Sequence, residues 1–157
     1  MQFLLDHEYV FTLYFALCIF IYFVPKRKYF YVPLILSFFI IETYWHFRPL
    51  PGPLDYIMVY IFMAISLFAI FKTDVFRILF ILTTTFCVQH ISYKATMIIC
   101  TLINPDLRGE ALYLILLIIF ICLTNTLIYF SFLRKVEKNN DIVINNYYLL
   151  WIALLMI

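Results

Sequence analysis

The chain has 157 residues, of which 66% are hydrophobic and 21% aromatic, and its mean hydropathy is +1.01. A soluble domain of this length cannot bury so much apolar surface, because soluble chains are only about half apolar. The net charge of +2, with no basic run interleaved with aromatic residues, argues against nucleic-acid binding. Composition therefore predicts an all-α, multi-pass transmembrane helix bundle in the cell membrane, with the lipid bilayer as its immediate partner.

Six hydrophobic segments are separated by polar stretches in which proline, glycine, asparagine and charge gather, as turns between helices require. The predicted spans cover residues 9–24, 29–47, 54–71, 75–103, 111–133 and 147–157. The last segment offers about eleven apolar residues where a span needs around twenty. We therefore expect about six spans with the last one truncated, and we expect residues 1–157 to be one domain at the front of a longer chain.

Basic residues predict the orientation of the bundle. If alternate connections share a side, eight lysines and arginines lie together, and they are Lys26, Arg27, Lys28, Lys72, Arg77, Arg134, Lys135 and Lys138. Two others, Arg48 and Arg108, lie opposite. Because positively charged loops stay in the cytoplasm, the amino terminus is expected outside. The start of the chain, acidic at Asp6 and Glu8, also argues against a cleavable signal peptide.

The cysteines and histidines give no sign of a cross-link or a metal centre. All four cysteines fall within apolar spans and none forms a CxxC pair, and they are Cys18, Cys87, Cys100 and Cys122. This pattern argues against a disulfide framework or a zinc site. The three histidines lie on different segments, so we expect no metal site.

Five polar side chains fall inside the predicted spans, and they are Glu42, Gln89, His90, Lys94 and Asn125. A charged side chain at a helix centre costs about 2.5–3.5 kcal/mol on insertion scales, so such residues normally face protein or a water-filled cavity. His90 and Lys94 are four residues apart and share a helix face, with Cys87 one turn before. We expect His90 near mid-membrane, and Glu42 paired with Lys94 in the outer half.

Trp45 and His46 lie just beyond Glu42, at the expected outer interface, where aromatic residues commonly anchor helices. The candidate ligand-binding or signal-coupling residues are Glu42, Trp45, His46, Gln89, His90 and Lys94. A purely structural role stays open, because polar residues also join spans at about 0.6 kcal/mol each. Asn125, between two threonines, is expected to make an interhelical polar contact.

Three stretches resemble a known family. The stretch "TTTFCVQHISYKATMIICTLINPDLRG", with its core at residues 88–91, resembles the fourth-span region of the membrane sensor in GHKL-type histidine kinases of Gram-positive bacteria, relatives of quorum-sensing peptide receptors. The stretches "FVPKRKYFYVPLILS" and "RKVEKNNDIVINNYYLL" resemble the basic first turn and the charged turn before the sixth span of these proteins. The resemblance implies a two-component sensor that detects an extracellular or membrane-borne signal, such as a peptide, and passes it to a cytoplasmic kinase.

The same resemblance implies a homodimer, a kinase domain that uses ATP and Mg, and a response regulator as the downstream partner. Residues 1–157 contain no phosphoacceptor-histidine region, no ATP-binding asparagine box and no glycine-rich lid, and two glycines could not build one. We therefore expect neither catalytic residues nor a cofactor within this chain.

Two other classes of protein stay open. A small transporter subunit would be supported by broken helices or inverted repeats, and the sequence shows neither. An intramembrane enzyme, such as a peptide-processing protease, could use Cys87 as nucleophile and His90, three residues later, as base. The sequence offers no evident third group to orient such a pair.

Overall fold

The computed structural model describes residues 7–47, 52–103 and 111–130, and these residues form five helices and no β-strand. The helices are α2 (Glu8–Phe23), α3 (Tyr31–Phe47), α4 (Pro53–Ile70), α5 (Val75–Ile103) and α6 (Ala111–Ile128). The predicted all-α class is confirmed, and each helix coincides closely with a segment predicted from hydropathy. The sixth predicted segment, 147–157, lies outside the described residues.

Two of these helices, α5 and α6, are long and apolar enough to cross a membrane. The apolar stretches of α2, α3 and α4 are shorter, at 17 residues or fewer. Large hydrophobic side chains are exposed along the helices, including Phe39 on α3, Ile65 on α4 and Leu127 on α6. Soluble monomers rarely expose large contiguous apolar patches. The described helices are thus compatible with a location in the membrane.

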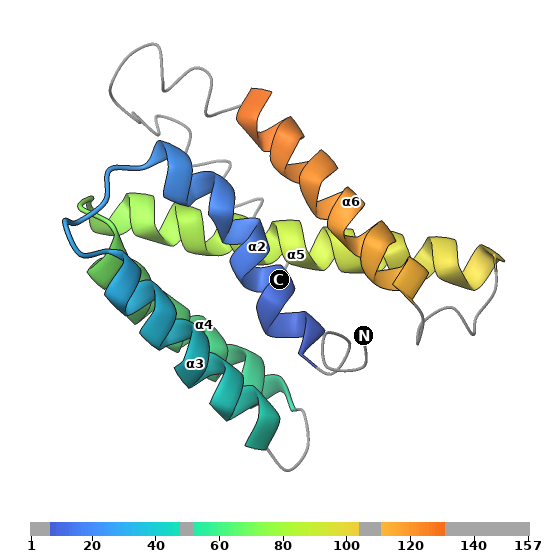
Figure 1. Cartoon of the computed structure of the whole chain (residues 1–157), viewed down its shortest axis with the longest axis horizontal. Coiled ribbons are helices and arrows are strands. Elements are labelled where there is room, and N and C mark those ends of the chain that lie inside the picture. Colours follow the sequence, from blue (N-terminus) through green and yellow to red (C-terminus); the bar gives the residue numbers. More distant parts are fainter. Residues whose placement is uncertain (1–6, 48–51, 104–110, 131–157) are drawn as a thin grey trace.

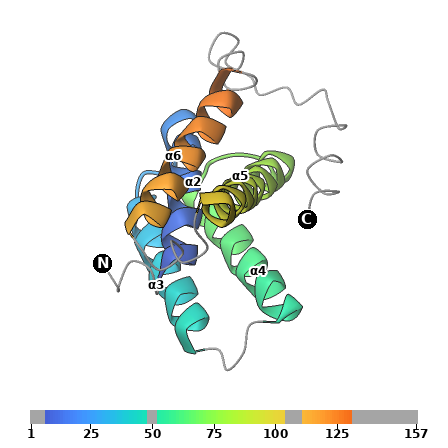
Figure 2. The ribbon, with the colours of Figure 1, turned by 90° about the vertical axis from the view of Figure 1, so that its right-hand side faces the viewer.

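Helices α3 and α4 form an antiparallel hairpin, and α2 packs against α3, α5 and α6 (Figures 1 and 2). Helix α5 also packs against α4 and α6. One buried apolar cluster joins α2, α4 and α5 through side chains that include Leu17, Met63 and Ile78. A second joins α5 and α6 to α2 around Val88 and Leu117. The long helix α5 therefore connects the α3–α4 hairpin to α6.

The stretches that follow α2 and α4 lie side by side at one end of the bundle. The N–H of Arg27 donates to the carbonyl of Ile70, and the N–H of Lys72 donates to the carbonyl of Pro25, both at 3.0 Å. Arg27 Nε also donates to the carbonyl of Phe68 at 3.3 Å. The last carbonyls of a helix have no partner within that helix, so the arginine helps to complete the end of α4. We call residues 24–30 and 71–74 the paired turns.

The paired turns bring basic residues together. Lys26, Lys28 and Lys72 are exposed there. Arg77, in the first turn of α5, is half-buried and bonds to Asp74 at 3.0 Å. This is the end of the bundle for which the charge pattern predicts a cytoplasmic location.

A buried amide joins α5 to the first turns of α2. Gln89 is 6% exposed, and its Nε2 donates to the carbonyl of Tyr9 at 2.7 Å and to Thr12 Oγ1 at 3.1 Å. It lies on a buried stripe of α5 with Thr85, Ser92 and Thr96, which follow one another at intervals of three or four residues. The contact fixes the register of α5 against α2.

We expect Gln89→Ala to lower the free energy of unfolding by roughly 0.6–1.7 kcal/mol, the range measured for polar contacts between membrane helices. The measurement is unfolding in detergent micelles followed by helical circular dichroism. His90→Ala is the matched control, because this neighbouring side chain is exposed and should change the value by less than about 0.5 kcal/mol. Equal losses for both variants would contradict the assignment of the buried face.

Candidate functional site

The end of the bundle opposite the paired turns is formed by the start of α2, the end of α3 and the start of α4 (Figure 1). Three aromatic rings meet there, one from each helix. Tyr9 and Trp45 stack with ring centroids 3.9 Å apart and planes inclined by 13°. Tyr56 meets both edge-on, at 5.9 and 5.6 Å. Such aromatic pairs contribute about 0.5–1.5 kcal/mol beyond burial, so the rings hold the three helix ends together.

Beside these rings, His7 contacts Glu42. Nδ1 of His7 lies against Oε1 of Glu42, and the two side chains are 16% and 15% exposed. The imidazole of His46 stacks on that of His7 at 5.6 Å. His7 occupies the N-cap of α2 but makes no side-chain bond to the helix backbone, so its ring is directed to α3. We call these residues the aromatic–histidine cluster: His7, Tyr9, Glu42, Trp45, His46 and Tyr56.

The second carboxylate oxygen of Glu42 is the unusual atom of the cluster. Oε2 is buried and accepts no hydrogen bond within the described residues. A buried acceptor without a partner costs about 1–3 kcal/mol. The cluster therefore holds an acceptor that can bind an incoming N–H or O–H group.

A network next to the cluster fixes α3 against α4. Tyr44, near the end of α3, donates its hydroxyl to Asp55 Oδ1 at 2.7 Å. Asp55 Oδ2 accepts the N–H of Gly52 at 2.7 Å, just before α4 begins. A carboxylate in the first turn of a helix is favoured by the helix dipole. Asp55 thus both starts α4 and holds the end of α3 that carries Glu42 and Trp45.

The expected pairing of Glu42 with Lys94 is wrong, because the carboxylate of Glu42 contacts His7 instead. Helix α3 packs mainly against α2 and α4, which places Glu42 beside the start of α2. Lys94 is exposed on α5, five residues beyond Gln89, or about 7.5 Å further along at 1.5 Å per residue. The two charges lie on different parts of the bundle.

The expected inward direction of His90 is also wrong. His90 is exposed and Gln89 is buried, because the buried stripe of α5 runs through Val88, Gln89 and Ser92. Successive residues of a helix are rotated by about 100°, so His90 and Lys94 turn out of the interior together. Since Gln89 contacts the first turn of α2, the neighbouring His90 lies beside the start of α2, midway along α5.

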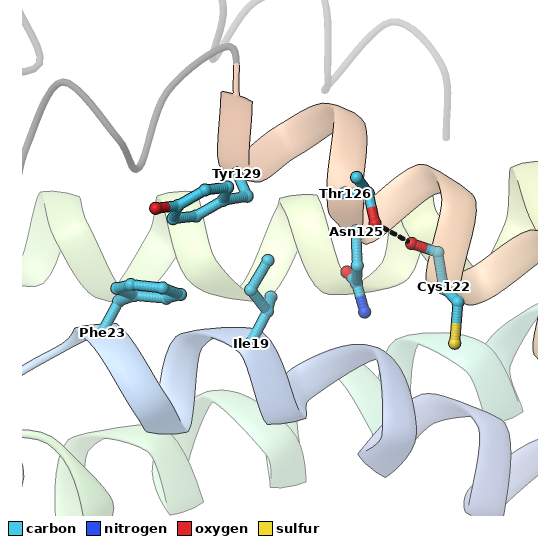
Figure 3. Close-up of a pocket in the computed structure, with 6 residues that line it drawn as sticks. All are labelled: Ile19, Phe23, Cys122, Asn125, Thr126 and Tyr129. Carbon is cyan, nitrogen blue, oxygen red and sulfur yellow. Dashed lines mark hydrogen bonds between the residues drawn. The ribbon is translucent and has the colours of Figure 1, made fainter.

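Asn125 points from α6 toward α2 (Figure 3). Its Oδ1 is buried and accepts no hydrogen bond from the described residues. The interhelical contact expected of Asn125 is made instead by its neighbour Thr124, whose hydroxyl lies 3.3 Å from that of Ser92 on α5.

Of the six candidate residues, the structure brings Glu42, Trp45 and His46 together, with Gln89 bonded to the backbone of Tyr9 beside them. Sequence reasoning missed His7, Tyr9 and Tyr56 as members of the cluster. The sequence feature that could have identified them is their position at the starts of predicted helices, where side chains from different helices meet. Within the part of the chain that the structure describes, no three or more His, Cys, Asp or Glu side chains are placed to share a metal ion. The imidazoles, the carboxylate and the aromatic rings of the cluster are groups suited to binding a ligand that has both polar and apolar parts.

No protein-family model matches the chain, and no curated protein or solved structure shows significant similarity to it. The residues and contacts described above are therefore the basis for a functional hypothesis.

A double-mutant cycle should detect the contact between His7 and Glu42. We expect His7→Ala and Glu42→Ala to couple by about 0.5–3 kcal/mol in the free energy of unfolding, as side chains in direct contact do. The measurement is unfolding of each single variant and of the double variant in detergent micelles. The cycle of Glu42→Ala with Lys94→Ala is the control and should be additive. Coupling to Lys94 and none to His7 would contradict the observed arrangement.

Proposed function

We propose that the chain is the membrane-embedded signal-input domain of a sensor protein, a multi-pass bundle with its amino terminus outside. The basic turns lie at one end of α2, α3 and α4, and the aromatic–histidine cluster lies at the other end. Positive-inside bias supports a cytoplasmic location for the basic end. The cluster then faces outward, where an extracellular or membrane-borne signal arrives.

One observation carries this proposal: the ends of three helices converge on a half-buried His7–Glu42 pair whose second carboxylate oxygen has no partner among the described residues. A ligand that donates a hydrogen bond to Oε2 would be favoured by the removal of this unsatisfied group. The ring faces of Tyr9, Trp45 and Tyr56 would accept an apolar or aromatic side chain next to it. An amphipathic peptide combines both features.

Binding at the cluster can change helix packing, because its members come from different helices. A ligand shifts an equilibrium only if it binds one state better than the other. A donor group that competes with His7 for Glu42 would loosen α2 from α3, whereas one that bridges to Oε2 would tighten them. Either change alters the relative position of helices that lead to the basic end.

The resemblance to GHKL-type histidine kinases extends the proposal to the output. In this scheme the sensor is a homodimer, a cytoplasmic kinase domain outside residues 1–157 uses ATP and Mg, and a response regulator receives the signal. The orientation supports the scheme, because α6 runs toward the basic end and so leads the chain toward the cytoplasm.

Orientation is testable with a membrane-impermeant maleimide on intact cells, in a variant whose four native cysteines are replaced by alanine. We expect Gly52→Cys to be labelled, and Lys28→Cys to be labelled only after the membrane is opened. A side chain fits at residue 52, since an added Cβ would lie 3.7 Å from Asp55 Oδ2. The reverse labelling would contradict the orientation, and labelling of both sites on intact cells would contradict the membrane-spanning bundle.

The sensing role is testable with the native gene product in the organism that makes it, using medium from a dense culture of that organism as the probe. We expect ATP-dependent phosphorylation in isolated membranes to change at least fivefold on addition of this medium. Glu42→Gln and Trp45→Ala should abolish the change and leave expression intact. Tyr31→Ala, an exposed aromatic at the start of α3, is the matched control.

A native product without phosphorylation would contradict the kinase output. A response that survives both cluster variants would contradict the proposed binding site. A response lost in Cys87→Ser and kept in Glu42→Gln would instead favour an intramembrane enzyme.

A further inference from the structure

The paired turns, which lie together at one end of the bundle, carry positive charge that faces outward (Figure 1). Four cations are exposed there, and they are Lys26, Arg27, Lys28 and Lys72. Among the described residues, no carboxylate forms an ion pair with any of them. Asp74, the one carboxylate of the paired turns, is already occupied: its Oδ2 bonds to Nε of Arg77 at 3.0 Å, and its Oδ1 accepts the N–H of Arg77 at 2.8 Å. The four cations are therefore available to an anion.

Backbone pairing places Arg27 and Lys72 on the same face of the paired turns. Lys26 and Phe71 form an antiparallel bridge. The next pair along sets Lys72 opposite Pro25, whose carbonyl accepts the N–H of Lys72 at 3.0 Å. Arg27 shares the face of Pro25, because successive side chains of an extended chain alternate in direction. Arg27 and Lys72 are thus diagonal neighbours, about 7–8 Å apart, and two such long side chains can reach one anionic group.

The guanidinium of Arg27 is held in position for such a contact. Its Nε donates to the carbonyl of Phe68, near the end of α4, at 3.3 Å. A guanidinium has further N–H groups in a rigid fork, and these can donate to a second acceptor. Arginine forks bind phosphate oxygens through parallel hydrogen bonds. With the ammonium group of Lys72 on the same face, the arrangement is suited to a phosphate group.

The other two lysines of the paired turns lie beside aromatic rings. Nζ of Lys26 is 5.3 Å from the ring centroid of Phe30, and Nζ of Lys28 is 5.5 Å from that of Tyr29. The face of an aromatic ring attracts a cation, so these contacts keep both ammonium groups close to the paired turns. They add positive charge next to the site between Arg27 and Lys72.

Exposed aromatic side chains accompany the charges. Tyr22 at the end of α2, Tyr29 in the paired turns and Phe76 at the start of α5 are 78%, 61% and 63% exposed. Aromatic rings beside lysines and arginines are typical of the level at which a helix leaves the membrane, among the lipid headgroups. A soluble anion would leave these rings in water. The combination favours a phosphate that is joined to acyl chains.

We propose that the paired turns bind the headgroup of an anionic phospholipid from the leaflet at the basic end of the bundle. The lipid phosphate lies between Arg27 and Lys72, and Lys26 and Lys28 attract neighbouring headgroups. This inference rests on the membrane-spanning part of the proposed function, and it depends neither on the orientation nor on signal sensing. A lipid bound in this way would join the link after α2 to the link after α4.

Native mass spectrometry of the purified full chain in detergent tests the proposal. The probes are phosphatidylglycerol and, as the zwitterionic comparison, phosphatidylcholine with the same acyl chains. We expect the first phosphatidylglycerol to bind at least tenfold more tightly than phosphatidylcholine. Higher ionic strength should weaken its binding, because salt screens exposed charges.

Variants locate the bound headgroup. Lys72→Gln should weaken phosphatidylglycerol binding about fivefold, which is the contribution of one cation near an anionic membrane surface. Arg27→Gln should weaken it at least as much, because a fork of donors is lost together with the charge. Lys94→Gln is the matched control, since this lysine is equally exposed but lies on α5, away from the paired turns. It should leave the affinity unchanged.

Helical circular dichroism of each variant shows whether it folds. Arg27→Gln also loses the hydrogen bond to Phe68, so its stability is the one at risk. Lys72 is exposed, and its side chain forms no hydrogen bond or ion pair within the described residues. Lys72→Gln therefore decides the test even if Arg27→Gln fails to fold.

Equal affinity for the two lipids, or unchanged affinity in Lys72→Gln, would overturn the proposal. Displacement of the lipid by an equal concentration of glycerol 3-phosphate would also overturn it and indicate a site for a soluble phosphate. Tighter binding of a hexaglutamate peptide than of phosphatidylglycerol would indicate an acidic protein segment instead. Labelling of Gly52→Cys and Lys28→Cys tests the membrane topology by itself, so its failure is distinguishable from a failure of lipid binding.

Discussion

The structure depends on one constraint: polar groups inside an apolar bundle must find partners within the protein. Gln89 meets it by donating to the backbone of Tyr9 and to Thr12. Serine and threonine hydroxyls meet it by bonding to their own helix, as Thr85 does with Ile81. Because apolar surroundings cannot replace these bonds, each fixes a helix face and a register more firmly than apolar packing alone. Glu42 Oε2 is one of the buried atoms in the described residues that do not meet the constraint, and it is the place where we propose binding of the signal.

The two ends of the bundle differ in chemistry. At one end, backbone hydrogen bonds hold two connecting stretches together and leave lysines exposed. At the other, helix ends are joined by side chains, through stacked rings and a His7–Glu42 contact. Side-chain contacts rearrange more readily than paired backbone groups, because rotamers change without breaking a helix. The second end therefore has more scope to rearrange.

Much of the fold was predictable from the sequence because apolar length and polar breaks determine where these apolar helices begin and end. Helix α5 lies at the predicted residues 75–103. The direction of its side chains was less predictable. An i, i+4 spacing shows that His90 and Lys94 share a face, but it does not show which face turns inward. In the structure, the inward face of α5 carries Gln89 together with Ser92 and several threonines, all of which are buried. The His7–Glu42 contact joins residues 35 positions apart, and no local pattern could reveal it.

The hydrogen bonds between the paired turns also have a mechanical consequence. The two paired turns cannot separate without breaking backbone hydrogen bonds. The basic end is therefore the fixed point about which α2 would tilt. Over the roughly 24 Å of α2, a tilt of about 10° moves the opposite end by about 4 Å. This displacement is as large as the 3.9 Å between the ring centroids of Tyr9 and Trp45, so such a tilt would separate the stacked rings. At the basic side, α2 also meets the end of α6, where the ring centroids of Phe23 and Tyr129 lie 5.1 Å apart.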